Sequence, residues 1–174
     1  KLDRLTRGNH QGVVAELSPV QFCDYREIIQ RAFEAGKDPF ILILDRVSDT
    51  RNFGAICRTA ECMGVDAIVI PIKGSAGINE TTVKTSAGAI FNVPVSRVKK
   101  LENTIDDIRD SGIKILGITE KSDTELRPGL VSGPMALVLG SEEDGISEGV
   151  LQLCHFKHAI PMKGKISSLN VSVA

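Results

Sequence analysis

The chain has 174 residues, a formal net charge of −1 and a pI of about 6.4. Hydrophobic residues make up 42% and charged residues 25%, which supplies a buried core and excludes a disordered chain. This balance also excludes a globally basic protein, so contact with nucleic acid would depend on a local basic patch. No apolar run reaches membrane-spanning length, and the four cysteines form no C-x-x-C pair, which favours a reduced, cytoplasmic protein.

Apolar runs and capping residues predict strands and helices in alternation after a polar beginning. Residues 1–16 are irregular, and we expect them to be a linker from an upstream module. Ser18 and Pro19 predict the start of an amphipathic helix that ends near Gly36. Phe40–Leu44 is a continuous apolar run, which is typical of a strand buried on both faces. We expect further strands at 67–70, 113–118, 135–139 and 158–160, an extended edge segment at 91–95, and helices at 52–63, 79–87, 98–111 and 147–154.

The alternation predicts an α/β fold, a mostly parallel sheet with helices on both faces, within residues 17–174. Ligands of such sheets bind at the carboxyl ends of the strands. Three loops expected there, at 49–60, 137–147 and 160–174, are rich in Gly, Asn, Ser and Glu. Taken singly, each is an ordinary connection from strand to helix, with Asn52 and the serines 167–168 as N-caps.

Taken together and in this order, the three loops closely resemble the motifs of the SpoU (TrmH-like) family of RNA ribose 2′-O-methyltransferases, over Phe40–Ala174. The segment 10–15 is similar to the beginning of the catalytic domain in members that methylate a guanosine of large-subunit ribosomal RNA. The resemblance implies a C-terminal trefoil knot, S-adenosylmethionine bound within the knot, a homodimer, an upstream RNA-binding module and a further helix beyond Ala174. Thr50 stands where the first motif usually has proline.

The resemblance also implies the catalytic residues. Arg58 corresponds to the arginine that contacts the 2′-hydroxyl, and a guanidinium is better suited to anchoring phosphate and stabilising charge than to acting as a base. Asn52 matches the asparagine of the first motif, and Glu142 matches the glutamate that orders the active site in the second. Ser168 and Asn170 match the polar residues of the third motif that face the cofactor and the substrate.

The cofactor pocket is expected to involve the backbones of Gly140, Ile160 and Leu169. Met162 is expected to add an apolar wall against the adenine, and Thr119 to border the same pocket or to lie in a surface loop.

Lys163 and Lys165 are the predicted RNA contacts outside the catalytic set, because their loop borders the proposed site and lysines bind phosphate. The basic run 97–100 is interpreted as an exposed helix start rather than as an RNA groove. His155 and His158 straddle a helix-to-strand junction without acidic or cysteine partners, and are interpreted as structural.

The sequence suggests other interpretations as well. The acidic run 142–144 invites a metal site, but no histidine or further carboxylate completes a shell for a hard cation, so no metal is expected. A nicotinamide-dependent oxidoreductase would require G-x-G-x-x-G after Leu44, and the loop there lacks it. A non-catalytic RNA-binding scaffold, or an enzyme that acts on a guanosine of transfer RNA, stays open.

Overall fold

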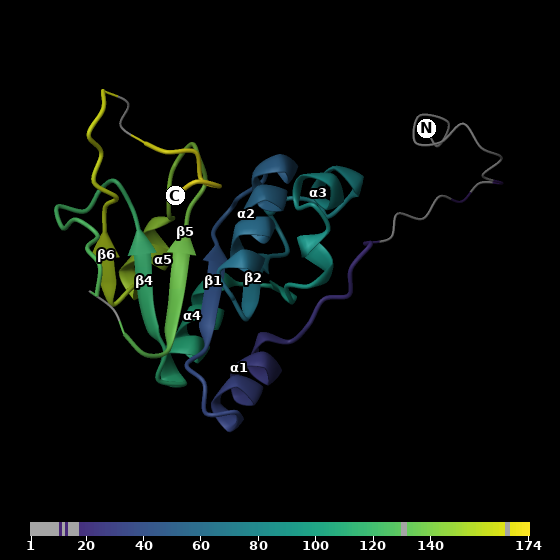
Figure 1. The fold of residues 1–174 in the computed structure, drawn as a ribbon, viewed down its shortest axis with the longest axis horizontal. Helices are drawn as coiled ribbons and strands as arrows, with labels where there is room; N and C mark the ends of the chain where they lie inside the picture. Colours follow the sequence, from purple (N-terminus) through teal and green to yellow (C-terminus); the bar gives the residue numbers. More distant parts are fainter. Residues whose placement is uncertain (1–10, 12, 14–17, 130–131, 166–167) are drawn as a thin grey trace.

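The computed structural model describes residues 11, 13, 18–129, 132–165 and 168–174. Its strands are β1 (Phe40–Leu44), β2 (Ala67–Pro71), β3 (Val95–Val98), β4 (Lys114–Ile118), β5 (Met135–Leu139) and β6 (Phe156–His158). They form one sheet in the order β3-β2-β1-β5-β4-β6, and every neighbouring pair is parallel (Figure 1). The strand order reverses at the centre of the sheet, between β1 and β5, which is where such sheets bind ligands.

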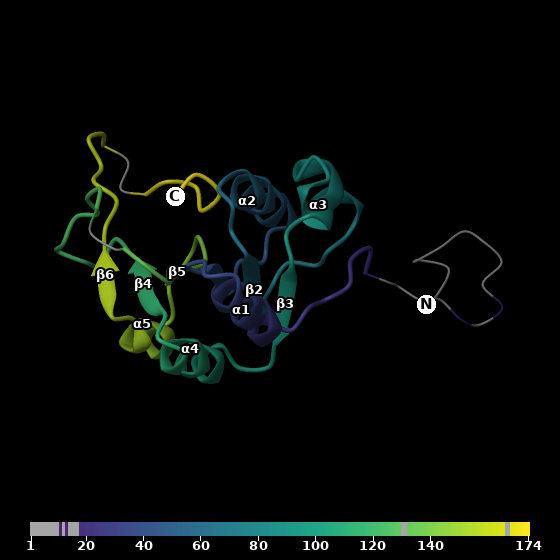
Figure 2. The same ribbon diagram turned by 60° about the horizontal axis from the view of Figure 1, so that its bottom comes forward.

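Helices cover both faces of the sheet, as the sequence predicts. Figure 2 shows α2 and α3 on one side of the sheet, and α1, α4 and α5 on the other. The helices are α1 (Tyr25–Glu34), α2 (Thr50–Cys62), α3 (Glu80–Thr85), the 3-10 helix η2 (Ala89–Phe91), α4 (Leu101–Asp110) and α5 (Glu148–Leu153).

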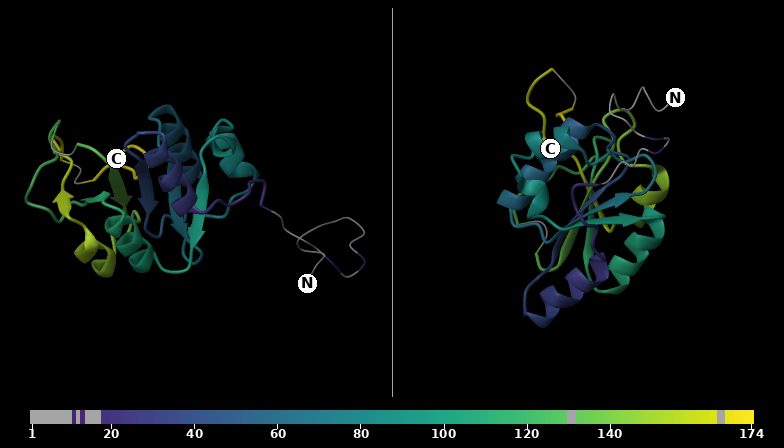
Figure 3. Two further views of the ribbon diagram at one scale, coloured as in Figure 1. Left: turned by 90° about the horizontal axis from the view of Figure 1, so that it is seen from below. Right: turned by 90° about the vertical axis from the view of Figure 1, so that its right-hand side faces the viewer.

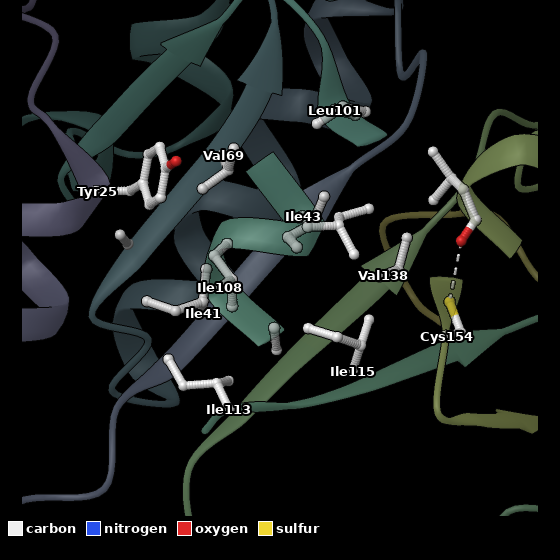
Figure 4. Close-up of a cluster of buried hydrophobic side chains, with 14 of the residues drawn as sticks. Tyr25, Ile41, Ile43, Val69, Leu101, Ile108, Ile113, Ile115, Val138 and Cys154 are labelled. Carbon is white, nitrogen blue, oxygen red and sulfur yellow. Dashed lines mark hydrogen bonds between the residues drawn. The ribbon is translucent and has the colours of Figure 1, made fainter. Parts of the chain in front are cut away.

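Two apolar cores result, because successive side chains of a strand point to opposite faces. Ile41 and Ile43 of β1 pack with α1, α4 and α5, and Figure 4 shows this cluster closing around Ile108. Leu42 and Leu44 pack with α2 and η2 on the other face. Apolar side chains therefore pack on both faces of the central strands. This packing fixes the positions of the loops that follow the carboxyl ends of those strands.

The first helix begins later than the sequence predicts, and the expected start at residues 18–19 is wrong. The backbone of Phe22 pairs with Val95 at the start of β3, which keeps this segment extended. Asp24 then caps α1, its carboxylate accepting the amide N–H of Arg26 at 2.9 Å.

The predicted cap of α2 is also wrong. Asp49, three residues before Asn52, caps this helix by accepting the amide N–H groups of Arg51 and Asn52, each at 2.8 Å. Asn52 therefore lies within the first turn of α2, and its side chain serves a different contact. Two strands are displaced as well. The edge strand β3 begins only at Val95, the last residue of the expected segment 91–95, and β6 ends at His158 instead of beginning there.

The segment that closes the chain lies at the carboxyl ends of the strands, and α1 lies toward the opposite end of the molecule (Figures 1 and 3). No helix among the described residues is long and apolar enough to cross a membrane. The trefoil knot that the family resemblance implies stays a prediction.

Cysteine reactivity tests this packing. Cys57 and Cys154 are buried, and burial raises the pKa of the Cys57 thiol to about 12 and that of Cys154 to about 11. Such thiols carry almost no reactive thiolate at mildly alkaline pH. We expect the exposed Cys23 and Cys62 to react rapidly with an aromatic disulfide reagent, and the buried pair to react only on unfolding. Four rapidly reacting thiols in the native protein would contradict this core.

Candidate active site

The side-chain amide of Asn170 joins the three loops that the sequence singles out. Its Nδ2 donates to Oδ1 of Asn52 at 3.2 Å and to Oε1 of Glu142 at 2.7 Å. Asn52 follows β1, and Glu142 follows β5. The bond to Glu142 ends on a carboxylate, which makes it stronger than a bond between neutral groups. One residue of the closing segment thus fixes the other two loops relative to each other.

Asn170 is itself oriented by the turn that it begins. Its Oδ1 accepts the amide N–H of Ser172 at 2.9 Å and the hydroxyl of the same residue at 2.6 Å. Its carbonyl oxygen accepts the amide N–H of Ala174 at 3.1 Å, as at the start of a helix. The cap is therefore Asn170 and not Ser168, which is exposed, while Ser167 lies outside the described residues. Because the side-chain oxygen is engaged in the cap, the nitrogen faces the other two loops.

A tight turn folds the loop after β5 back on itself. Ser141 and Gly145 exchange two backbone hydrogen bonds, of 3.1 and 3.0 Å. Gly140 lies directly against this turn, and a Cβ added to it would stand 2.0 Å from the carbonyl carbon of Gly145. Any side chain at Gly140 would push the turn outward. The turn contains Glu142, so the bond to Asn170 depends on this close backbone contact.

Two residues directly after β1, which the sequence interpretation missed, hold the same loop at its far end. Asp45 is buried, and its Oδ2 accepts the amide N–H of Ser147 at 2.6 Å. Arg46 donates from Nη1 to Asp144 at 3.0 Å and from Nη2 to the carbonyl of Gly145 at 3.2 Å. It does so from a left-handed backbone, with a φ of 61°. The only sign of these two residues in the sequence is that they are polar and follow a strand. That pattern does not distinguish residues that hold a neighbouring loop, as this clamp of Asp45 and Arg46 does, from ordinary exposed charges.

A cavity of about 280 Å³ opens where these loops meet. It lies among the carboxyl ends of β4 and β5, the turn after β5 and the closing segment, and Glu142 and Ser168 both line it. Its lining also includes every residue that the sequence assigns to the cofactor, namely Thr119, Gly140, Ile160, Met162 and Leu169.

A second hollow, of about 410 Å³, adjoins the first cavity on the side of α2. Arg46 and Asn52 line the second hollow but not the first, whereas Glu142 and Val171 line both. Two neighbouring hollows that share a carboxylate could hold two reactants side by side.

The predicted RNA contacts lie outside both hollows. Arg58 is exposed on α2, about 9 Å along the helix axis from Asn52. Lys163 and Lys165 are exposed in the closing segment. The segment 10–15 lies outside the described residues except for positions 11 and 13.

The histidines and acids form no metal site in the part of the chain that the structure describes. Nδ1 of His155 accepts the amide N–H of Ile115 at 3.0 Å, which is a structural contact. His158 is buried in β6, in register with Ile118 of β4.

The fold and the site define a parallel α/β protein whose ligand cavity is completed by its own C-terminal segment. The sequence profile of the SpoU rRNA Methylase family matches residues 39–174. The chain therefore belongs to the SpoU methylase family.

Individual relatives agree with this assignment. YacO of Bacillus subtilis, described as a TrmH family tRNA/rRNA methyltransferase, is 39% identical over 174 residues, which are 100% of this chain and 70% of YacO. The SpoU methyltransferase AviRb of Streptomyces viridochromogenes has 29% identity and a TM-score of 0.72, over 79% of this chain and 55% of AviRb, and is also solved with AdoMet. The TrmH/SpoU tRNA modifying enzyme of A. aeolicus has 27% identity and a TM-score of 0.68, over 85% of this chain and 77% of that one. The chain thus spans about half the length of AviRb and 70% of YacO.

Replacing Arg46 with glycine should separate loop positioning from stability. Glycine adopts a φ of 61° without strain, but the variant loses a partly exposed ion pair with Asp144 and a second one, of 3.4 Å, with the buried Asp45. We therefore expect the free energy of unfolding to fall by about 1–3 kcal/mol, which leaves the protein folded. The turn after β5 loses two hydrogen bonds, so we expect the affinity for S-adenosylmethionine to fall about fivefold. Urea unfolding and calorimetric titration measure the two effects.

Ala87→Gly is the matched control, because Ala87 also has a left-handed backbone, with a φ of 51°, and is exposed outside both hollows. Its ligand affinity should stay at the wild-type value. A fall in affinity that merely follows a fall in stability, in either variant, would contradict the role given to Arg46.

Proposed function

We propose that this protein transfers a methyl group from S-adenosylmethionine to a ribose 2′-hydroxyl of RNA. The junction at Asn170 is the observation that carries the proposal, because it holds the three motif loops around one cavity. Membership of the SpoU methylase family supports the same reaction class.

The chemistry of the first cavity fits S-adenosylmethionine. Leu139, Met162 and Val171 offer apolar side chains to the adenine ring, and Glu120 and Glu142 offer carboxylates to the positively charged sulfonium and ammonium groups. The volume of about 280 Å³ is close to the lower end of the usual ligand pockets, ~300 Å³. When bound there, S-adenosylmethionine supplies an activated methyl group.

The residues of this chain position the reactants, which is the main way a protein accelerates such a transfer. The ribose would occupy the second hollow, next to Asn52, and the donor the first. Glu142 borders both hollows, so the bond from Asn170 to its carboxylate sets the geometry of their boundary. The 2′-oxygen forms a bond to the methyl carbon as the carbon–sulfur bond breaks, and the hydroxyl proton leaves to an oxygen of the RNA phosphate.

Arg58 is proposed to act on the RNA and not on the donor. A guanidinium stays protonated, so it anchors the phosphate beside the reacting ribose and stabilises the charge that develops there. Its exposed position on α2 suits a contact with a large substrate. Lys163 and Lys165, also exposed, are proposed to bind neighbouring phosphates.

A guanosine of large-subunit ribosomal RNA is the proposed target, supported by the resemblance of segment 10–15 to the beginning of the catalytic domain in enzymes with that substrate. The family description also refers to rRNA. A guanosine of transfer RNA is the second candidate, because the A. aeolicus relative is a tRNA modifying enzyme. We further propose that the protein works as a homodimer, as the family resemblance implies.

Arg58→Ala separates the chemistry from donor binding. Because Arg58 lines neither hollow, we expect the affinity for S-adenosylmethionine to stay within about twofold of wild type, while methylation falls at least about a hundredfold. Calorimetric titration and transfer of a labelled methyl group to RNA measure the two quantities. Arg31→Ala, at an exposed arginine of α1, is the control. Equal losses of binding and methylation in Arg58→Ala would refute the assignment.

The substrate is tested by incubating the full-length protein with labelled S-adenosylmethionine and separate pools of ribosomal and transfer RNA. We expect label on one ribose of large-subunit ribosomal RNA, located by resistance of the adjacent bond to alkali. Label confined to transfer RNA would select the second candidate, and no label in either pool would refute the enzymatic proposal.

A further inference from the structure

A wider hollow lies at the β3 edge of the sheet, away from the proposed active site. It measures about 720 Å³ and is formed by residues 22–26, 96–100 and 103–104, which we call the β3 groove. The lining contains four cationic side chains and a single carboxylate, that of Asp24, although the whole chain has a net charge of −1. The cations are Arg26, Arg97, Lys99 and Lys100.

Most of this charge is not neutralised by the protein. Arg26 is bound by Asp107, so it adds little to the field of the groove. Arg97, Lys99 and Lys100 form no ion pair within the described part of the chain. Both lysines are exposed. In addition, Lys100 is the N-cap of α4 and makes no side-chain capping bond, so the positive end of the helix dipole adds to the potential, offset in part by Glu102 in the first turn.

The groove also contains an aromatic ring that contacts an arginine. The guanidinium of Arg97 lies over the ring of Phe22, 5.0 Å from its centre, and donates to the carbonyl of Ile72 at 3.3 Å. Phe22 keeps 38% of its surface exposed, which is high for a phenylalanine. An aromatic ring paired with an arginine is a surface on which nucleic-acid bases stack.

We propose that the β3 groove binds the sugar–phosphate backbone of the RNA substrate, at a distance from the reacting ribose. The inference rests on the proposed function, since it requires an RNA substrate. Phosphate is the ligand that unpaired cations recognise, and the Phe22–Arg97 pair favours nucleic acid over a simple acidic peptide. The run 97–100, which its sequence pattern presents as an ordinary exposed helix start, is thereby an RNA-binding element.

The position of the groove agrees with this role. Lys99 and Lys100 follow the carboxyl end of β3, and the loops of the active site follow the carboxyl ends of β1, β4 and β5. Two strands separate β3 from β5, which corresponds to about 15 Å at the usual spacing of strands. A structured RNA with one ribose in the site covers this distance, so the groove extends the contact surface along one edge of the sheet.

The test is the double variant Lys99→Gln, Lys100→Gln in the full-length protein. Neither side chain makes a hydrogen bond or an ion pair within the described residues, so folding should be unaffected. We expect the affinity for the RNA that the wild type methylates to fall about tenfold at moderate salt. The slope of log K against log salt concentration should become shallower by about 2, one for each lost phosphate contact. The affinity for S-adenosylmethionine should not change.

The control removes two exposed lysines elsewhere, with Lys37→Gln and Lys157→Gln. An unchanged salt slope in the groove variant, or an equal change in the control, would overturn the proposal. A change of oligomeric state in sedimentation with unaltered RNA binding would also overturn it, and would assign the groove to a protein interface. Failure of the wild type to bind any RNA would refute the proposed function together with the groove. If the wild type methylates RNA and the groove variant binds that RNA as the wild type does, the proposal for the groove is refuted and the proposed function stands.

Discussion

Three loops that are distant in the chain become one site through the hydrogen bonds of a single side-chain amide, that of Asn170. Its nitrogen reaches the first turn of α2 and the turn after β5, and its oxygen is held by the helical turn that it begins. The amide is thus used on both sides, and no other side chain of its size offers two donors and an acceptor in this arrangement. The boundary between the two hollows, at Glu142, follows from this contact.

The hydrogen bonds of Asn170 lie near the surface, so they can orient the three loops only if other contacts already hold these loops close together. The parallel sheet supplies that closeness, because β1 and β5 are hydrogen-bonded neighbours whose carboxyl ends meet. The turn after β5 is then confined by the absence of a side chain at Gly140 and by the clamp from Asp45 and Arg46. The left-handed backbone of Arg46 is a local cost of this clamp. Strain of this kind at the edge of a ligand cavity agrees with a role in positioning.

Sequence alone predicts much of this fold, for a physical reason. A continuous apolar run such as 40–44 or 135–139 has few alternatives to burial on both faces, so its local pattern decides its place. The start of α1 was missed because Phe22 pairs with Val95, a contact between distant segments that no local pattern contains. The cap of α2 was misassigned because Asp49 and Asn52 are both good caps. Asp49 takes the role, and the side chain of Asn52 accepts a hydrogen bond from Asn170, a contact that no local pattern contains.

Some residues of the site could likewise be predicted from the sequence, and others could not. Motif resemblance led to Asn52, Glu142 and Ser168, which line the two hollows, and also to Arg58, which lines neither and whose role stays a proposal. It did not lead to Asp45 and Arg46, whose importance lies in two distances and one backbone angle. For the basic run 97–100 the sequence favours an exposed helix start over an RNA groove, since three cations in a run are common on helix starts. Only the neighbouring Phe22 and the hollow, which the sequence does not show, support the second interpretation.

The most direct test of the central claim is the affinity of Asn170→Asp for S-adenosylmethionine, measured by calorimetric titration. The substitution keeps the shape of the side chain and places a second carboxylate 2.7 Å from that of Glu142, where the wild type has a hydrogen bond. We expect at least about tenfold weaker binding with an unchanged circular dichroism spectrum, and no effect from Asn92→Asp at an exposed position outside both hollows. Wild-type affinity in Asn170→Asp would contradict the claim that this residue assembles the site.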